Sequence, residues 1–206
     1  MNGSGADGPD AGSPEARLSL VAIGASAGGV AALGEILPAL PPDFPLPVVV
    51  VVHVPPSRHS LLAELFDKRC RLPVLEAEDK TRLEPGHVYF SPPDYHLMIE
   101  EDLSCSLSVD EPVNFSRPSI DVLLESAASS IGDGVLAIIL TGTSADGAQG
   151  LKAVREADGI GWVQSPETAH SALMPQRAIE VGGADAVLTL PQIAERLVRL
   201  KQEVRS

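Results

Sequence analysis

Two patterns of apolar positions alternate along the chain from residue 18 onward. Short, mostly apolar runs, typical of buried strands, occur at 18–24, 46–54, 135–142, 159–164 and 186–190. Stretches with one apolar face, typical of helices, occur at 28–40, 60–69, 119–131, 147–157, 175–181 and 191–204. Strands that alternate with helices indicate right-handed crossovers and a parallel sheet. We therefore predict an α/β fold with a doubly wound, mostly parallel sheet and helices on both faces.

The stretch from 72 to 110 has a different pattern. Short extended pieces at 72–77, 87–92, 95–100 and 104–109 are separated by turns rich in Pro, Gly and acidic residues. This pattern predicts an antiparallel β-hairpin or small meander inserted into the α/β domain.

Composition limits the domain organisation and the class of partner. Residues 1–16 are small, polar and rich in Pro and Gly, which predicts a disordered tail before a folded domain at 17–206. The formal net charge of −13 and the aromatic content of 3% disfavour nucleic-acid binding. The longest apolar run is far shorter than a membrane span, and the N-terminus lacks a signal-peptide pattern. We therefore expect a cytoplasmic protein without membrane insertion.

The residues that follow the strands carry the candidate chemistry, because ligands of doubly wound sheets bind beyond the carboxyl ends of the strands. The first strand runs into Gly24-Ala25-Ser26-Ala27-Gly28-Gly29 and then a helix. Gly-x-Ser-x-Gly in this place is the pattern of a nucleophile elbow. A dinucleotide-binding loop is the alternative, but it needs glycine where Ser26 stands and an acidic residue about 20 positions later. His53 stands at the end of the second strand instead.

His53 and Asp146 are the candidate partners of Ser26. A histidine at a strand end is often structural, but neighbouring parallel strands lie ~4.8 Å apart, close enough for Ser26 and His53 to meet. Asp146 precedes a helix, where an aspartate is commonly an N-cap, and it can also accept a hydrogen bond from His53. The order Ser–His–Asp differs from the Ser–Asp–His order of the α/β-hydrolases.

The remaining histidines and the cysteines do not indicate a metal centre. His59, His87, His96 and His170 lack metal-ligand spacing, and we interpret them as surface or turn residues. Cys70 and Cys105 support neither a disulfide framework nor a four-ligand zinc site. We expect no metal and no cofactor.

Over residues 18–200 the chain resembles the catalytic domain of the bacterial chemotaxis receptor protein-glutamate methylesterases. The matching blocks, in order, are IGASAGG (23–29), VVHVPP (51–56), LEPGHVYFSPPDYHL (83–97), VNFSRPSIDVLLESAA (113–128), LTGTSADGAQGL (140–151) and MPQRAIEVGGADAV (174–187). The resemblance implies hydrolysis of γ-glutamyl methyl esters on the cytoplasmic helices of methyl-accepting chemoreceptors, often with deamidation of glutamines. It places the family's triad on Ser26, His53 and Asp146.

The chain departs from the family pattern near the expected oxyanion hole. Thr143-Ser144 stands where the family usually has Met-Gly, and Ala27 stands where a threonine is common. Backbone N–H groups survive such changes, so we expect the amides of Ala27 and Thr143 to hold the oxyanion. A non-catalytic, receptor-binding member of the family is therefore an alternative to the enzyme.

Regulation and substrate contact are the remaining expectations. Many family members carry a phospho-receiver domain, which needs about 120 residues. Only about 17 residues precede the first strand, so we expect a stand-alone monomeric enzyme or a domain of a longer protein. Receptor helices are rich in glutamate while this chain is acidic. We therefore predict a local basic rim for substrate binding, formed by Arg58, Arg117 and Arg177.

Overall fold

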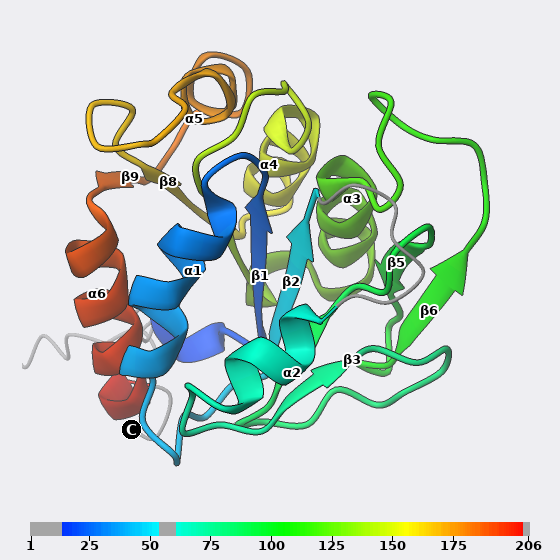
Figure 1. Ribbon diagram of the computed structural model, residues 1–206, viewed down its shortest axis with the longest axis vertical. Coiled ribbons are helices and arrows are strands. Elements are labelled where there is room, and N and C mark those ends of the chain that lie inside the picture. Colours follow the sequence, from blue (N-terminus) through cyan, green and yellow to red (C-terminus); the bar gives the residue numbers. More distant parts are fainter. Residues whose placement is uncertain (1–13, 54–60, 204–206) are drawn as a thin grey trace, which may run out of the picture.

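The computed structural model describes residues 14–53 and 61–203, which form a doubly wound α/β domain (Figure 1). Within these ranges the strands of the main sheet are β1 (Leu20–Ala25), β2 (Val48–Val52), β3 (Val74–Glu76), β4 (Val88–Phe90), β7 (Val135–Ile139), β8 (Ile160–Gln164) and β9 (Ala186–Leu188). They lie in the order β3-β4-β2-β1-β7-β8-β9, and every pairing is parallel. The α/β prediction is confirmed.

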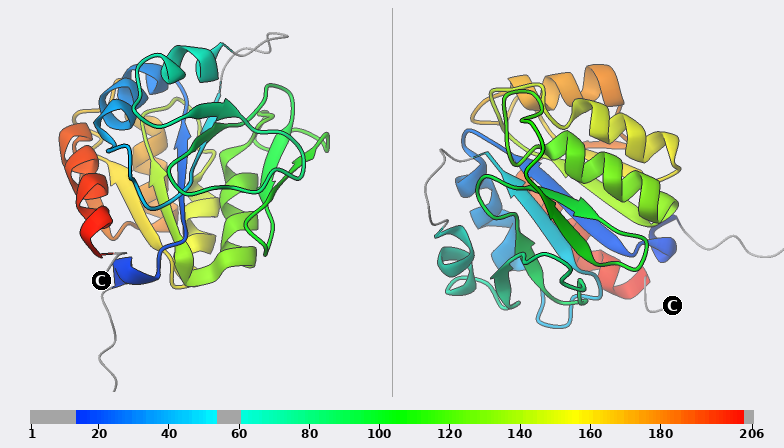
Figure 2. Two further views of the ribbon diagram at one scale, coloured as in Figure 1. Left: turned by 90° about the horizontal axis from the view of Figure 1, so that it is seen from below. Right: turned by 90° about the vertical axis from the view of Figure 1, so that its right-hand side faces the viewer.

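Helices cover both faces of the sheet (Figure 2). One face carries α1 (Gly29–Ile36), the 3-10 turn η2 (Leu37–Ala39), α2 (Leu62–Asp67) and α6 (Leu190–Glu203). The other face carries α3 (Ile120–Ile131), α4 (Ala148–Glu156), α5 (Leu173–Arg177) and the π-helical turn η4 (Ala178–Gly182). Successive strand residues point to opposite faces of the sheet, so the apolar side chains of β1, β2 and β7 pack into two separate hydrophobic cores.

The stretch from 72 to 110 is only partly antiparallel. β5 (His96–Ile99) and β6 (Cys105–Ser108) form the predicted antiparallel hairpin, which packs against α3. β3 and β4, however, extend the main sheet as parallel strands beyond β2. The meander interpretation was wrong for these two strands, because α2 and a long connection return the chain to the same end of the sheet before each one.

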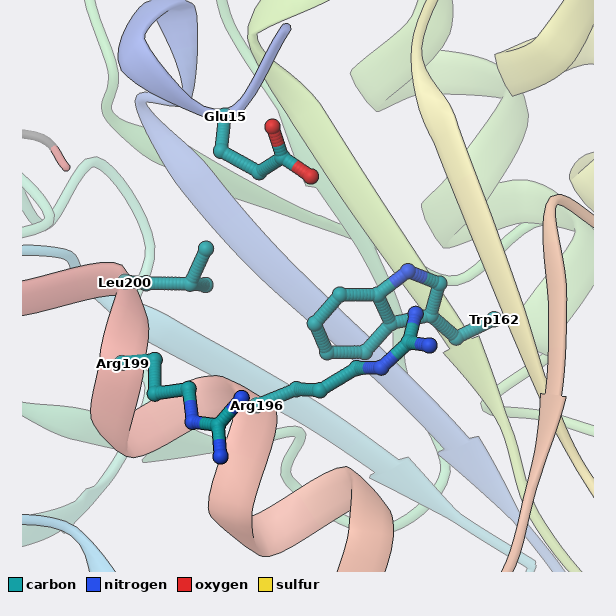
Figure 3. A pocket seen from close by; sticks show the side chains of 5 residues that line it. All are labelled: Glu15, Trp162, Arg196, Arg199 and Leu200. Atoms are coloured by element: carbon teal, nitrogen blue, oxygen red, sulfur yellow. The ribbon is translucent and has the colours of Figure 1, made fainter. Parts of the chain in front are cut away.

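The N-terminal segment contributes one turn to the fold. Residues 1–13 of the predicted tail lie outside the described residues, and Pro14–Arg17 form the 3-10 turn η1. Glu15 of this turn lines a pocket of about 250 Å³ with Trp162, Arg196, Arg199 and Leu200 (Figure 3). The Arg196 guanidinium of α6 lies 5.8 Å from the centre of the Trp162 ring on β8, within the range of a cation–π contact.

No helix in the described ranges combines the length and the apolar character needed to cross a bilayer.

Candidate active site

The carboxyl ends of β1, β2 and β7 bring three loops together. β1 is flanked by β2 and β7, with Ala25 opposite Val52 and Gly24 opposite Ile139. Backbone hydrogen bonds continue past the strands, from the His53 amide to the Ala25 carbonyl (3.0 Å) and from the Ser26 amide to the Thr141 carbonyl (2.9 Å). The sheet order reverses at β1, so these loops stand at its topological switch point.

Two glycines shape the turn that carries Ser26. Gly28 has a φ of 82°, and a Cβ there would lie 2.6 Å from Cβ of His170. A Cβ on Gly142 would lie 2.9 Å from Cβ of Ser26 and 2.7 Å from Cε of Met174. Glycine is therefore needed at both positions, for the left-handed backbone at Gly28 and for the close approach of two loops at Gly142.

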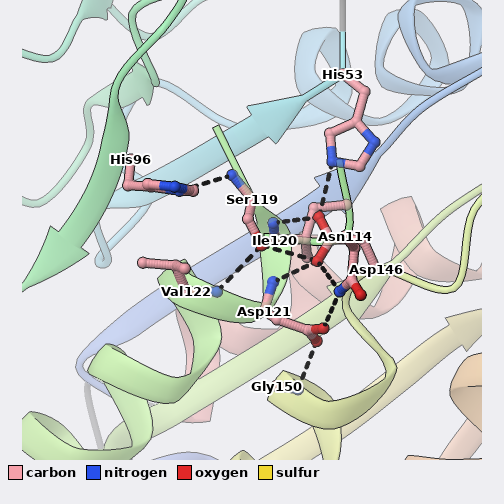
Figure 4. A network of polar contacts seen from close by, with 9 residues as sticks. All are labelled: His53, His96, Asn114, Ser119, Ile120, Asp121, Val122, Asp146 and Gly150. Atoms are coloured by element: carbon pink, nitrogen blue, oxygen red, sulfur yellow. Dashed lines mark hydrogen bonds and ion pairs between the residues drawn. The ribbon is translucent and has the colours of Figure 1, made fainter. Parts of the chain in front are cut away.

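His53 contacts Asp146 directly (Figure 4). Nε2 of His53 lies 2.8 Å from Oδ2 of Asp146, and the two side chains are 12% and 0% exposed. In the neutral tautomer that donates from Nε2 to the carboxylate, Nδ1 keeps a lone pair that can accept a proton. The predicted His–Asp pair is therefore present, with Nδ1 as the nitrogen available to a nucleophile.

Asp146 accepts from more than His53. Four further donors among the described residues point at its carboxylate: the Ile120 amide (2.7 Å), the Ser119 hydroxyl (2.8 Å), the Asp121 amide (3.1 Å) and Nδ2 of Asn114 (3.2 Å). The two amides are the first N–H groups of α3, which have no partner inside their own helix.

The N-cap interpretation of Asp146 was wrong for the helix that follows it. Its side chain does not cap α4, whose N-cap is Gly147 with a φ of 92° and no side-chain hydrogen bond. It binds the N-terminus of α3 instead, a helix that comes earlier in the chain. A carboxylate at this end of a helix is stabilised by the helix dipole.

These contacts make Asp146 strongly acidic. Burial alone would raise its pKa, but the hydrogen bonds from His53, from the Ile120 amide and from the Ser119 hydroxyl outweigh burial and lower the pKa to about 2. Asp146 is therefore an anion at neutral pH and can stabilise a protonated His53.

A second buried carboxylate, Asp121, lies beside the first. Nδ2 of Asn114 donates to Asp121 (2.8 Å) as well as to Asp146, and the Gly150 amide donates to the other oxygen of Asp121 (2.7 Å). Burial and the neighbouring charge of Asp146 raise the pKa of Asp121 to about 6, although the Gly150 amide opposes this shift. Two adjacent carboxyl groups thus have pKa values shifted in opposite directions.

The contact between Ser26 and His53 stays a prediction. Within the part of the chain that the structure describes, no hydrogen bond joins Oγ of Ser26 to His53, although their loops are bonded through the backbone. Catalytic hydrogen bonds are often long before substrate binds.

The predicted oxyanion donors, the amides of Ala27 and Thr143, directly follow Ser26 and Gly142 in the chain. Over the described ranges, the amides of Ala27 and Thr143 donate to no other residue, as an oxyanion hole requires. The neighbouring Ser144 hydroxyl is buried and has no partner among the described residues. The serine in place of glycine at 144 therefore adds an unsatisfied polar group to this loop.

The predicted basic rim is not assembled by the described arginines. Arg58 lies outside the described residues. Arg117 binds Asp94 (2.7 Å) and the carbonyls of Val109 (2.8 Å) and Asp110 (3.0 Å). Arg177 on α5 pairs with Glu180 (2.8 Å). Arg117 nevertheless lines the same pocket as His53, so its predicted role in substrate binding stays open to test.

The pocket at His53 has a volume of about 230 Å³ and is lined by His53, Asp94, Pro112, Phe115, Ser116, Arg117 and Pro118. Most of these residues come from one loop, 109–118, between the hairpin and α3. No cluster of three metal-binding side chains occurs in the described ranges.

Several supporting residues were missed from the sequence. The network around Asp146 includes Asn114, Ser119 and Asp121, for which we predicted no role. His96, interpreted as a surface or turn residue, is 1% exposed, and its ring contacts the Ser119 amide at Nδ1 and the Glu111 carbonyl at Nε2. The block 113–128 was a signal for these residues, but nothing local in it indicates which groups they contact.

Comparison with known proteins decides the family. The model of the CheB methylesterase family matches residues 21–197. This chain belongs to the CheB methylesterase family. A protein of Leptospira interrogans, provisionally named a protein-glutamate methylesterase/protein-glutamine glutaminase, is 47% identical over 88% of this chain and 94% of its own length.

A relative from Archaeoglobus fulgidus, named protein-glutamate methylesterase/protein-glutamine glutaminase, is 39% identical over 87% of this chain, which spans about half (52%) of that relative's length. The crystal structure of the Thermotoga maritima CheB methylesterase catalytic domain superimposes with a TM-score of 0.84. It is 38% identical, and the match covers 89% of this chain and 98% of that one. The fold described above is therefore the fold of this family's catalytic domain.

Proposed function

We propose that this protein is a serine hydrolase that cleaves γ-glutamyl methyl esters on the cytoplasmic helices of chemoreceptors, releasing methanol, and that it also deamidates glutamines there. The observation that carries the proposal is the buried His53–Asp146 pair, 2.8 Å apart, beside the turn that presents Ser26. Membership of the CheB methylesterase family and the names of the relatives support the substrate class.

The proposed reaction uses the three side chains in sequence. Nδ1 of His53 accepts the Ser26 proton as Oγ attacks the ester carbonyl, while Asp146 stabilises the imidazolium. The amides of Ala27 and Thr143 hold the oxyanion. The C–OCH₃ bond then breaks, His53 protonates the departing methoxide, and water hydrolyses the acyl-enzyme through the same base. For a glutamine, ammonia leaves in place of methanol.

The decisive experiment measures methanol release from a methylated chemoreceptor cytoplasmic fragment, with wild type and Ser26→Ala side by side. We expect release by wild type and none detectable with the variant, since losing the nucleophile of a comparable triad costs about 10⁶ in rate. A fluorophosphonate probe should label wild type and not the variant.

Two results would refute the proposal. Equal methanol release by wild type and Ser26→Ala would assign the chemistry to another group. Binding of the fragment without release by wild type would make the protein a non-catalytic receptor-binding member of the family.

A further inference from the structure

Phe115 is the most exposed large apolar side chain of the described residues, and it lines the pocket of His53. Its relative exposure is 104%, whereas the other exposed large apolar residues lie between 37% and 65%. Pro112 and Pro118 line the pocket beside Phe115, and the exposed Val109 (65%) and Val113 (37%) belong to the same loop. Apolar groups that gather beside a pocket commonly mark a binding surface.

The backbone that presents Phe115 is strained. Val113 and Ser116 exchange both backbone hydrogen bonds (3.2 and 2.9 Å), which closes a two-residue turn around Asn114 and Phe115. Their φ angles are 49° and 62°, both positive as in a type I′ turn. Asparagine tolerates this conformation, but a phenylalanine at the second central position of the turn, as at Phe115, is sterically less favourable than glycine.

The turn is held at its base on both sides. Asn114 donates to the buried carboxylates of Asp121 and Asp146, and Arg117 binds Asp94 together with two loop carbonyls. Asn114 therefore links the turn to Asp146, the acid of the site. A strained, fixed turn that exposes an aromatic ring indicates a function for the ring, because neither burial nor local stability accounts for it.

We propose that Phe115 is a specificity-determining contact, which packs against an apolar side chain of the substrate helix next to the ester-bearing glutamate. This inference rests on the function proposed above. Residues three and four positions from a glutamate lie on the same face of a helix, so a ring at the rim can meet an apolar side chain at one of these positions while the ester reaches His53. The ring contacts the protein substrate and takes no part in bond breaking.

The test compares two substrates across matched variants. For Phe115→Ala we expect kcat/KM on the methylated receptor fragment to fall about tenfold or more, mainly through KM, as for one lost aromatic contact. Hydrolysis of p-nitrophenyl acetate, which lacks a flanking helix, should fall by a much smaller factor. Phe115→Leu should recover most of the loss. Leu75→Ala, which removes an exposed apolar side chain from the edge strand β3, should match wild type on both substrates.

Phe115→Gly separates this role from a structural one. Removing both the ring and the strain should raise the melting temperature while it weakens activity on the receptor fragment. Unchanged kcat/KM for Phe115→Ala, or equal losses on both substrates, would overturn the inference. A gel-filtration result in which wild type is a dimer and Phe115→Ala a monomer would overturn the inference as well, because the ring would then contact a second copy of the chain. Failure of wild type to release methanol would instead refute the proposed function.

Discussion

Replacing Asp146 by asparagine tests whether this carboxylate fixes the proton of His53. Asparagine keeps the shape of the side chain but exchanges one accepting oxygen for an NH₂ donor. Placed at the Oδ1 position, the NH₂ would oppose the donors Ser119, Asp121 and Asn114. Placed at Oδ2, it leaves one buried amide, that of Ile120, without a partner. The second orientation is the less costly one.

In that orientation the NH₂ of the asparagine donates to Nε2 of His53, so the ring proton moves to Nδ1. Nδ1 can then no longer accept a proton from Ser26, and kcat should fall by about 10⁴, as for this exchange in other Ser-His-Asp triads. One unpaired buried amide costs about 1–3 kcal/mol. For a domain of this size, about 2 kcal/mol lowers the melting temperature by about 4–8 °C.

The assays are p-nitrophenyl acetate hydrolysis and a thermal melt at pH 7.5. Asp158→Asn is the control, since the same exchange on an exposed turn before β8 should alter neither quantity. Activity within tenfold of wild type would refute the tautomer argument. A large loss of activity with an unchanged melting temperature would refute the assigned hydrogen bonds.

Two further predictions concern the loop at Gly142 and the carboxyl of Asp121. Gly142→Ala should lower activity more than tenfold by displacing Ser26, since its Cβ would lie 2.9 Å from that of Ser26, whereas Gly34→Ala on α1 should keep full activity. Because the folded-state pKa of Asp121 is raised to about 6, the folded protein binds a proton that the unfolded chain binds only near pH 4. The contribution of Asp121 to the free energy of unfolding should therefore increase as the pH falls from 7 to 5. As the pH rises above about 6, this contribution should disappear. A pH series of thermal melts that is identical for wild type and Asp121→Asn would contradict this assignment.

The sequence predicts the fold well where apolar runs are long. β1, β2 and β7 are buried on both faces, so their runs are unbroken and unambiguous. β3 and β4 have three residues each, too few to reveal the direction of their neighbours. Their direction depends on connections that return the chain to one end of the sheet, which local pattern does not encode.

The candidate site was likewise predictable from the sequence only in part. The contact between His53 and Asp146 could be predicted because both residues follow strands and the sheet brings strand ends together, whereas the approach of Ser26 to His53 stays a prediction. The partners of Asp146 at the start of α3 and in the loop before it lie 25 to 32 positions away in sequence, and hydrogen bonds over such separations have no local signature.

Arg117 illustrates the same limit. Its place in a matching block suggested contact with substrate, which stays a prediction, but it did not reveal the partners that the side chain has within the protein. The structure shows its guanidinium bound to Asp94, 23 positions earlier, and to carbonyls of its own loop.

The buried ring of His96 has a consequence for transplanting this chemistry to other proteins. It joins β5 to the Ser119 amide and to the chain after β6, so the hairpin fixes the end of α3 that receives Asp146. If only the strand-end loops were grafted onto another scaffold, that scaffold would carry Asp146 but would lack the hydrogen-bond donors at the start of α3 that stabilise its carboxylate. The hairpin, α3 and the loop between them would have to move as one module.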